Sequence, residues 1–124
     1  CMLCHKGCPV GAIFGEKHEI QSIDQDRCIE CGYCANVCNM GAVKDSAWHD
    51  ITPVKKADWK KPVIDRETCV GCSVCVQNCP KNCLKIEDAK FHGDINTIAI
   101  MARENDCIGC KICEKVCPIA AIHF

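Results

Sequence analysis

The sequence is poor in large apolar side chains. Only 5% of its 124 residues are aromatic, and the hydrophobic fraction of 48% includes sixteen cysteines. A chain of this length with so few large side chains cannot rely on an apolar core alone and needs a further source of stability, such as bound metal. The composition therefore predicts one or two very small domains that are held together by more than apolar packing.

Several other features are missing, and each absence excludes a class of protein. No apolar run approaches the ~18–20 residues of a membrane helix, and the longest useful run is 95–102. The sequence has no glycine-rich phosphate loop, no dinucleotide fingerprint and no pairing of a nucleophile with a base. We therefore expect neither a transmembrane segment nor the substrate site of a complete enzyme.

Cysteine is the abundant residue, and most of it follows one spacing. Twelve cysteines form three copies of C-x2-C-x2-C-x3-C, namely Cys28, Cys31, Cys34 and Cys38; Cys69, Cys72, Cys75 and Cys79; Cys107, Cys110, Cys113 and Cys117. A fourth copy, Cys1, Cys4 and Cys8, lacks only its first member. Three thiolates within seven residues can hold three corners of an iron–sulfur cube while the fourth reaches away. The four runs predict four 4Fe-4S clusters and a protein that transfers electrons.

Other cysteine chemistries fit this spacing less well. Disulfides join separate segments, whereas these sulfurs crowd within short loops. Structural zinc sites use two separated C-x2-C pairs, to which a third closely spaced cysteine is surplus. The C-x3-C-x2-C motif of radical S-adenosylmethionine enzymes is also absent. After Cys4 and Cys8 its third cysteine would stand at Gly11, and after Cys79 and Cys83 it would stand at Ile86. A zinc-stabilised structural adaptor without redox activity remains the alternative from another class.

The sixteenth cysteine, Cys83, lies outside the four runs. When the segments that follow each run are aligned on the last cysteine of the run, Cys83 falls where the other copies have Ala12, Ala42 and Ala121. We therefore expect Cys83 to be a small buried side chain beside a cluster and not a ligand.

Two segments between neighbouring runs have the pattern of β-hairpins. Residues 11–27 place a glycine-containing turn between apolar pieces, and residues 80–106 do the same over a greater length, with a turn signal at 91–94. We also expect short strands at 23–24 and 64–65, and one helical turn before each fourth cysteine. The predicted fold class is α+β.

The runs group into two pairs that are separated by an ordered linker. We expect a first module at 1–46, a linker at 47–62 and a second module at 63–124. Trp48 and Trp59 are expected to pack the linker onto the modules, and anchoring to a partner subunit is the alternative. The lysine doublets of this stretch are expected to be solvated, with docking of an acidic partner as the alternative.

The paired runs resemble bacterial-type ferredoxins with two 4Fe-4S clusters, here as two modules in tandem. The resemblance implies crossed ligation, in which the fourth cysteine of each run binds the cluster of its paired run. The implied ligand sets are Cys1, Cys4 and Cys38 with an upstream ligand (cluster 1); Cys28, Cys31, Cys34 and Cys8 (cluster 2); Cys69, Cys72, Cys75 and Cys117 (cluster 3); Cys107, Cys110, Cys113 and Cys79 (cluster 4).

The sequence departs from the ferredoxin pattern at two places. Asn39 stands where the other runs have proline, which changes a turn but no ligand. The first cysteine of the first run and the strand that would precede it are both missing, so we expect further sequence upstream of Cys1.

Bound clusters would make the net charge of the protein more negative. The formal charge is −1, and four oxidised clusters of about −2 each would bring the holoprotein to about −9. That charge disfavours binding to nucleic acid and favours binding to basic protein surfaces.

Thiolate ligands require a reducing compartment, which indicates the cytoplasm. We expect a non-catalytic electron-transfer subunit of a larger anaerobic oxidoreductase, partnered by its catalytic subunit or a redox protein; the alternative is a freely diffusing polyferredoxin.

Overall fold

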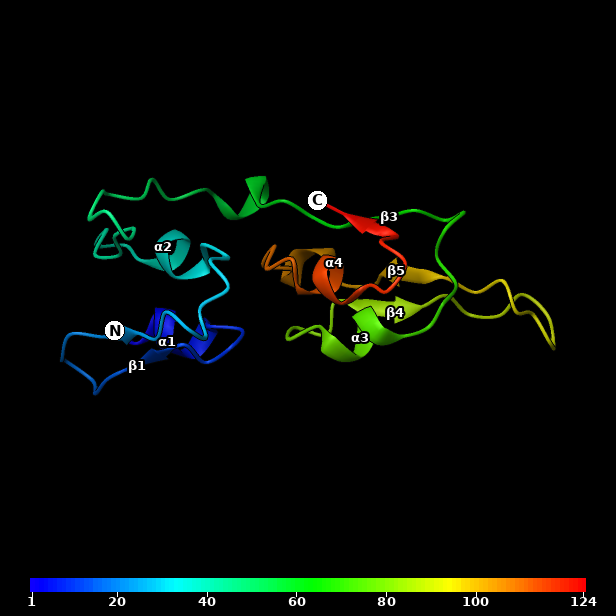
Figure 1. Cartoon of the computed structure of the whole chain (residues 1–124), viewed down its shortest axis with the longest axis horizontal. Helices are drawn as coiled ribbons and strands as arrows, with labels where there is room; N and C mark the ends of the chain where they lie inside the picture. Colours follow the sequence, from blue (N-terminus) through cyan, green and yellow to red (C-terminus); the bar gives the residue numbers. More distant parts are fainter. The chain divides into compact units, whose positions relative to one another are not determined.

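The computed structural model describes all residues from 1 to 124 and divides into two units, Cys1–Trp59 and Lys60–Phe124 (Figure 1). Each unit contains two of the four cysteine runs. The finer boundaries expected from the sequence, 1–46, 47–62 and 63–124, stay a prediction.

The first unit contains two short helices and one short hairpin. Its elements are α1 (Leu3–Gly7), β1 (Ile13–Phe14), β2 (Ser22–Ile23), α2 (Tyr33–Val37) and the 3-10 turn η1 (Lys56–Asp58). Strands β1 and β2 are antiparallel, with Ile13 opposite Ile23. The hairpin predicted at 11–27 is thereby confirmed.

The second unit repeats this arrangement with two pairs of strands. Its elements are β3 (Val63–Ile64), α3 (Val74–Asn78), β4 (Leu84–Ile86), β5 (Ala99–Met101), η2 (Glu104–Asp106), α4 (Ile112–Val116) and β6 (Ile122–His123). β4 pairs with β5, and β3, the first strand, pairs with β6, the last; both pairs are antiparallel. The segment between β4 and β5 extends well beyond the paired residues (Figure 1), which confirms the expected longer hairpin.

All four helices lie where the sequence predicted a helical turn, and each begins in the same way. The residue before each helix has a left-handed conformation, with φ between 62° and 76°, at Met2, Gly32, Ser73 and Lys111. This residue directly follows the second cysteine of its run. The left-handed residue reverses the direction of the backbone between the cysteine loop and the helix that follows it.

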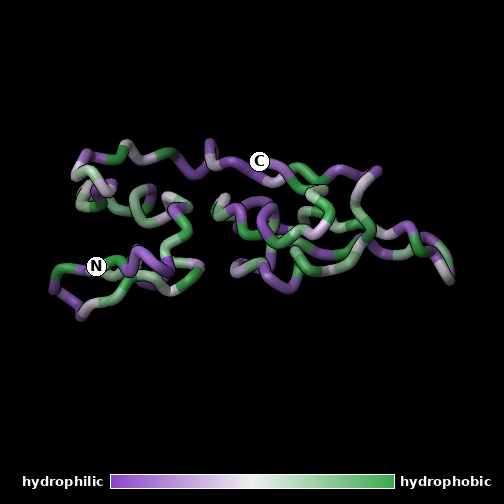
Figure 2. Tube along the Cα trace, in the orientation of Figure 1, coloured by the Kyte–Doolittle hydropathy of each residue, from purple (hydrophilic) through white to green (hydrophobic).

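The apolar core is small, and cysteine contributes much of it. In the second unit the buried cluster consists of Cys75, Leu84, Ala99, Cys113 and Ile122, with Cys69, Cys79 and Cys117 packed against it. Apolar and polar stretches alternate along the sequence and form no long apolar segment (Figure 2). None of the helices has the length and apolar character that crossing a bilayer requires. Cysteine side chains thus form part of the core of the second unit.

The tryptophans of the expected linker behave differently. The Trp59 ring meets the Tyr33 ring edge-on, with 5.8 Å between centroids, and its indole N–H donates to the carbonyl of Val54 at 2.9 Å. Trp48 is 82% exposed. The expectation that both tryptophans pack the linker onto the modules is wrong for Trp48, because the turn before it leaves its ring in solvent.

Candidate metal centres

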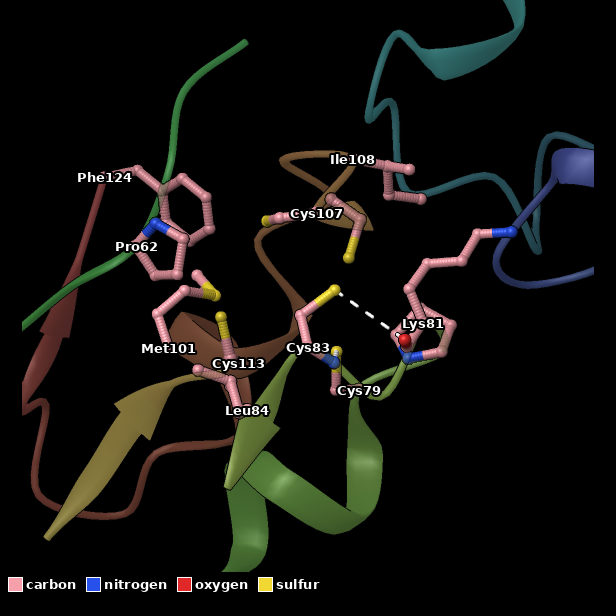
Figure 3. Close-up of a pocket in the computed structure, with 12 residues that line it drawn as sticks. Pro62, Cys79, Lys81, Cys83, Leu84, Met101, Cys107, Ile108, Cys113 and Phe124 are labelled. Carbon is pink, nitrogen blue, oxygen red and sulfur yellow. Dashed lines mark hydrogen bonds between the residues drawn. The ribbon is translucent and has the colours of Figure 1, made fainter. Parts of the chain in front are cut away.

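A pocket in the second unit collects cysteines from two different runs. Cys79, the last cysteine of one run, lines this pocket together with Cys107, Cys110 and Cys113, the first three of the next. In Figure 3 side chains from separate loops surround a common space. The structure therefore brings together the four residues that the ferredoxin resemblance assigns to cluster 4.

The complementary set also lies close together. Burial raises the pKa of the Cys75 thiol, and the neighbouring charges of Cys69, Cys72 and Cys117 raise it further. Cys117 belongs to the last run, yet it lies within electrostatic reach of Cys75, which belongs to the run before. The residues assigned to cluster 3 are thus also neighbours.

The first unit has an equivalent pocket. It is lined by Cys8 from the first run and by Cys28, Cys31 and Cys34 from the second. Burial raises the pKa of Cys31, a backbone hydrogen bond from Tyr33 lowers it, and the charges of Cys8 and Cys28 raise it again. The residues assigned to cluster 2 therefore share one pocket.

The remaining set, Cys1, Cys4 and Cys38, is less enclosed. Cys1 is exposed, and neither of the two pockets described above includes these three side chains. The pKa of Cys38 is lowered, chiefly by the backbone N–H of Ala42. The structure thus favours the thiolate form of Cys38.

One hydrogen bond recurs at the fourth cysteine of every run. The backbone N–H four residues later donates to the cysteine sulfur, in the pairs Ala12 to Cys8 at 3.2 Å, Ala42 to Cys38 at 3.4 Å, Cys83 to Cys79 at 3.3 Å and Ala121 to Cys117 at 3.3 Å. An N–H that points at sulfur stabilises a thiolate. The recurrence supports the sequence alignment that placed Cys83 with three alanines.

Left-handed residues also flank the second cysteine of the complete runs. Glu30, Gly71 and Gly109 precede that cysteine with φ between 54° and 67°, and the residue after it is left-handed in each case. Loops with such left-handed turns direct successive backbone N–H groups inward and form anion-binding concavities, which is a feature of iron–sulfur sites. The loops therefore suit a negatively charged group held by thiolates.

The donor sets of the two pockets have the chemistry that an iron–sulfur cluster needs. Each pocket is lined by four cysteines from two runs, and a 4Fe-4S cube takes one thiolate at each of its four corners. The residues assigned to clusters 2 and 4 therefore suit a 4Fe-4S cluster by number and type of ligand.

Cys83 lies in the same pocket as Cys79 and Cys107 but has a different environment. It is 1% exposed, and its Sγ donates to the carbonyl of Lys81 at 3.7 Å (Figure 3). Burial, with the charges of Cys79 and Cys107, raises its pKa to about 12. The expected burial is confirmed, and the hydrogen bond that turns the thiol toward the Lys81 carbonyl supports a packing role.

Sequence reasoning missed the packing of Tyr33 against α1. A Cβ built on Gly7 would overlap Cε1 of Tyr33, so only glycine leaves room for the ring in this position. Gly7 and Tyr33 belong to different runs, and no local pattern predicts their contact. The only signal in the sequence was the glycine itself. Gly7 is the last residue of α1, and glycine is unfavourable within a helix.

Comparison with known proteins identifies domains of one description in both units. A family model described as a 4Fe-4S dicluster domain matches residues 62–124, and a second model of the same description matches 1–42 and 27–83. Ferredoxin-3 of Nostoc sp. is 35% identical over 71 residues, which are 51% of the present sequence and 72% of that protein.

Two further relatives are subunits of enzymes. The B subunit of the anaerobic dimethyl sulfoxide reductase of Escherichia coli is 31% identical over 110 residues, 81% of the present sequence and 48% of its own length. Pyruvate synthase subunit PorD of Methanothermobacter marburgensis is 29% identical over 68 residues, 55% of the present sequence and 65% of its own. The protein therefore spans about half the length of the reductase subunit that it matches.

Proposed function

Since the chain belongs to the 4Fe-4S dicluster domain family, we propose that it transfers electrons through four 4Fe-4S clusters as the non-catalytic, ferredoxin-like subunit of a larger oxidoreductase complex. The observation that carries the proposal is the pairing of runs within each unit. Cys79 shares a pocket with the first three cysteines of the run that follows it, and Cys8 shares a pocket with the first three cysteines of the second run. Such gathering of four sulfurs from two loops is what a cube with four corner ligands requires.

The protein's own residues hold the clusters and set their environment. The cysteines supply thiolates, while backbone N–H groups such as that of Ala121 donate to the sulfurs and offset negative charge. Each bound cluster would supply one-electron redox chemistry without the breaking of a covalent bond. The buried side chains around Cys75 and Cys113 keep water from part of the sulfur surface.

The relatives favour a subunit over a freely diffusing carrier. Two of them are subunits of a dimethyl sulfoxide reductase and a pyruvate synthase, so a catalytic subunit is the expected partner here. The free polyferredoxin remains the second candidate, because Ferredoxin-3 matches over most of its own length. A cytoplasmic location, which reduced cysteines favour, is part of the same proposal.

Two measurements on the full-length protein, isolated anaerobically, test the proposal. Metal and sulfide analysis should return about sixteen irons and sixteen sulfides, since each cube contributes four of each. Zinc in place of iron would establish the structural adaptor instead. Size-exclusion chromatography of the native extract, followed by identification of co-eluting proteins, separates the two roles, because a free carrier should elute alone.

A further inference from the structure

In each half of the second unit, a segment from elsewhere in the unit lies against the loop that holds the first two cysteines of a run. A Cβ built on Gly71 would overlap the carbonyl oxygen of Thr97, and a Cβ built on Gly109 would lie 2.8 Å from the carbonyl oxygen of Lys60. Both glycines precede the second cysteine of their run. The segments that begin at Thr97 and at Lys60 are therefore structural counterparts, each lying across the loop of one run.

Two residues further along, the counterparts differ in one hydrogen bond. Ala99 donates its backbone N–H to the sulfur of Cys69 at 3.5 Å. Its counterpart is Pro62, which lines the pocket of Cys107 but has no N–H to donate. The Cys107 loop thus lacks the sulfur-directed donor that the Cys69 loop receives from the matching segment.

A cation lies beside the loop that lacks this donor. The ammonium of Lys61 donates to the carbonyl oxygen of Cys107 at 3.0 Å, in a partly buried position. The counterpart of Lys61 in the other half is Ile98, which is buried and uncharged. Only one of the two cluster loops therefore receives a positive charge from its crossing segment.

The other charges around the Cys107 pocket do not cancel this ammonium. Asp106 directly precedes Cys107, and its carboxylate pairs with Arg103 at 3.6 Å. Arg103 also donates to the carbonyl of Lys81 at 2.8 Å, and Lys81 itself lines the pocket. The carboxylate of Asp106 thus pairs with Arg103, whereas the ammonium of Lys61 contacts the Cys107 loop directly.

A positive charge or an N–H donor near a cluster sulfur stabilises the reduced cluster, which is more negative, and so raises the reduction potential. Resting on the proposed function, we propose that Lys61 is a tuning residue for the cluster of Cys107, Cys110, Cys113 and Cys79. The charge of Lys61 raises the reduction potential of that cluster. It takes the place of the hydrogen bond to sulfur that Pro62, which has no N–H, cannot donate.

The test is a redox titration of the holoprotein, followed by electron paramagnetic resonance. The variant Lys61→Gln keeps a donor for the Cys107 carbonyl but removes the charge. We expect one cluster to shift to lower potential, such that its reduced-to-oxidised ratio at a fixed potential falls about tenfold, the effect of one nearby unit charge in a partly buried site. Lys61→Arg should retain the parent potential, whereas a purely structural role for Lys61 would move no potential.

The matched control is Lys60→Gln, which removes the same charge from the exposed neighbouring residue and should leave every potential unchanged. Pro62→Ala provides an independent arm, because it restores an N–H and should raise the potential of the same cluster. If Lys61→Gln shows the parent potential, or shifts no further than Lys60→Gln, the inference is overturned. If Lys61→Gln fails to bind its clusters, the absence of a rise in Pro62→Ala overturns it.

These outcomes are distinct from failure of the proposed function. A parent protein that contains no iron–sulfur signal at all would refute the proposed function before any variant is made. A parent protein with full clusters whose potential ignores Lys61 would refute only the role of this lysine.

Discussion

The backbone N–H of Cys83 donates to the sulfur of Cys79 at 3.3 Å, while the Cys83 thiol itself turns to the carbonyl of Lys81. The backbone of residue 83 therefore performs the role that Ala12, Ala42 and Ala121 perform in the other repeats. Its side chain adds a sulfur to the lining of the pocket, with no counterpart in the other three repeats.

Replacing Cys83 with Ala should therefore leave all clusters in place. The N–H to Cys79 is retained, and the loss of one buried sulfur atom should cost about 1 kcal/mol of stability. Iron content and thermal unfolding of the variant measure both expectations. The matched control, Cys79→Ala, should lose a cluster, and a loss of about four irons from Cys83→Ala would show that Cys83 is a ligand.

Crossed ligation predicts which pairs of cysteine changes are redundant. Cys79→Ser and Cys107→Ser should each damage the same cluster, so the double variant should lose about four irons, no more than either single variant. Cys79→Ser combined with Cys69→Ser should damage two clusters and lose about eight. Iron analysis distinguishes these results, and the reverse pattern would mean that Cys79 binds within its own run.

The contact between Gly7 and Tyr33 makes the first unit sensitive to a single methyl group. Gly7→Ala would place a Cβ in steric overlap with Cε1, Cζ and the hydroxyl oxygen of Tyr33, so we expect a loss of about 1–3 kcal/mol in the free energy of unfolding. Denaturant unfolding of the cluster-loaded protein measures this loss. In a Tyr33→Ala background the same change should cost little, and equal costs in both backgrounds would contradict the contact.

The potential of one cluster should follow the charge at residue 61. Lys61→Gln lowers the potential of the Cys107 cluster, Lys61→Arg retains it and Lys60→Gln changes nothing. The same titrations at higher ionic strength should reduce any effect of the exposed Lys60 more than that of the partly buried Lys61. An effect of Lys61 that salt abolishes completely would indicate a distant surface charge and not a contact.

Local patterns in the sequence predicted the repeating parts of this fold. The cysteine spacing placed four helical turns, and the turn signals placed both hairpins, because these features depend on residues close together in the sequence. The same periodicity aligned Cys83 with three alanines, which the hydrogen bonds to the fourth cysteines support. The ligand sets themselves were an expectation from resemblance, and the iron measurements test them.

Contacts between distant residues were not predictable in this way. Lys61 meets Cys107 across forty-five intervening residues, and in the sequence it was one lysine of a doublet expected to be solvated. Trp59 packs against Tyr33 whereas Trp48 lies in solvent, although both are tryptophans of the same linker. Such differences depend on where the backbone returns in space, which neither composition nor spacing encodes.

The pairing of β3 with β6 has a consequence for biosynthesis. The first strand of the second unit finds its partner only at Ile122 and His123, so a nascent polypeptide cannot close this unit until nearly all of it has been translated. Until then the cysteines around Cys75 remain accessible to oxidants and to competing metals, because long-range pairing comes late. A cell that makes this protein would need to shield the emerging thiols and deliver iron and sulfide only after residues 122–123 have left the ribosome.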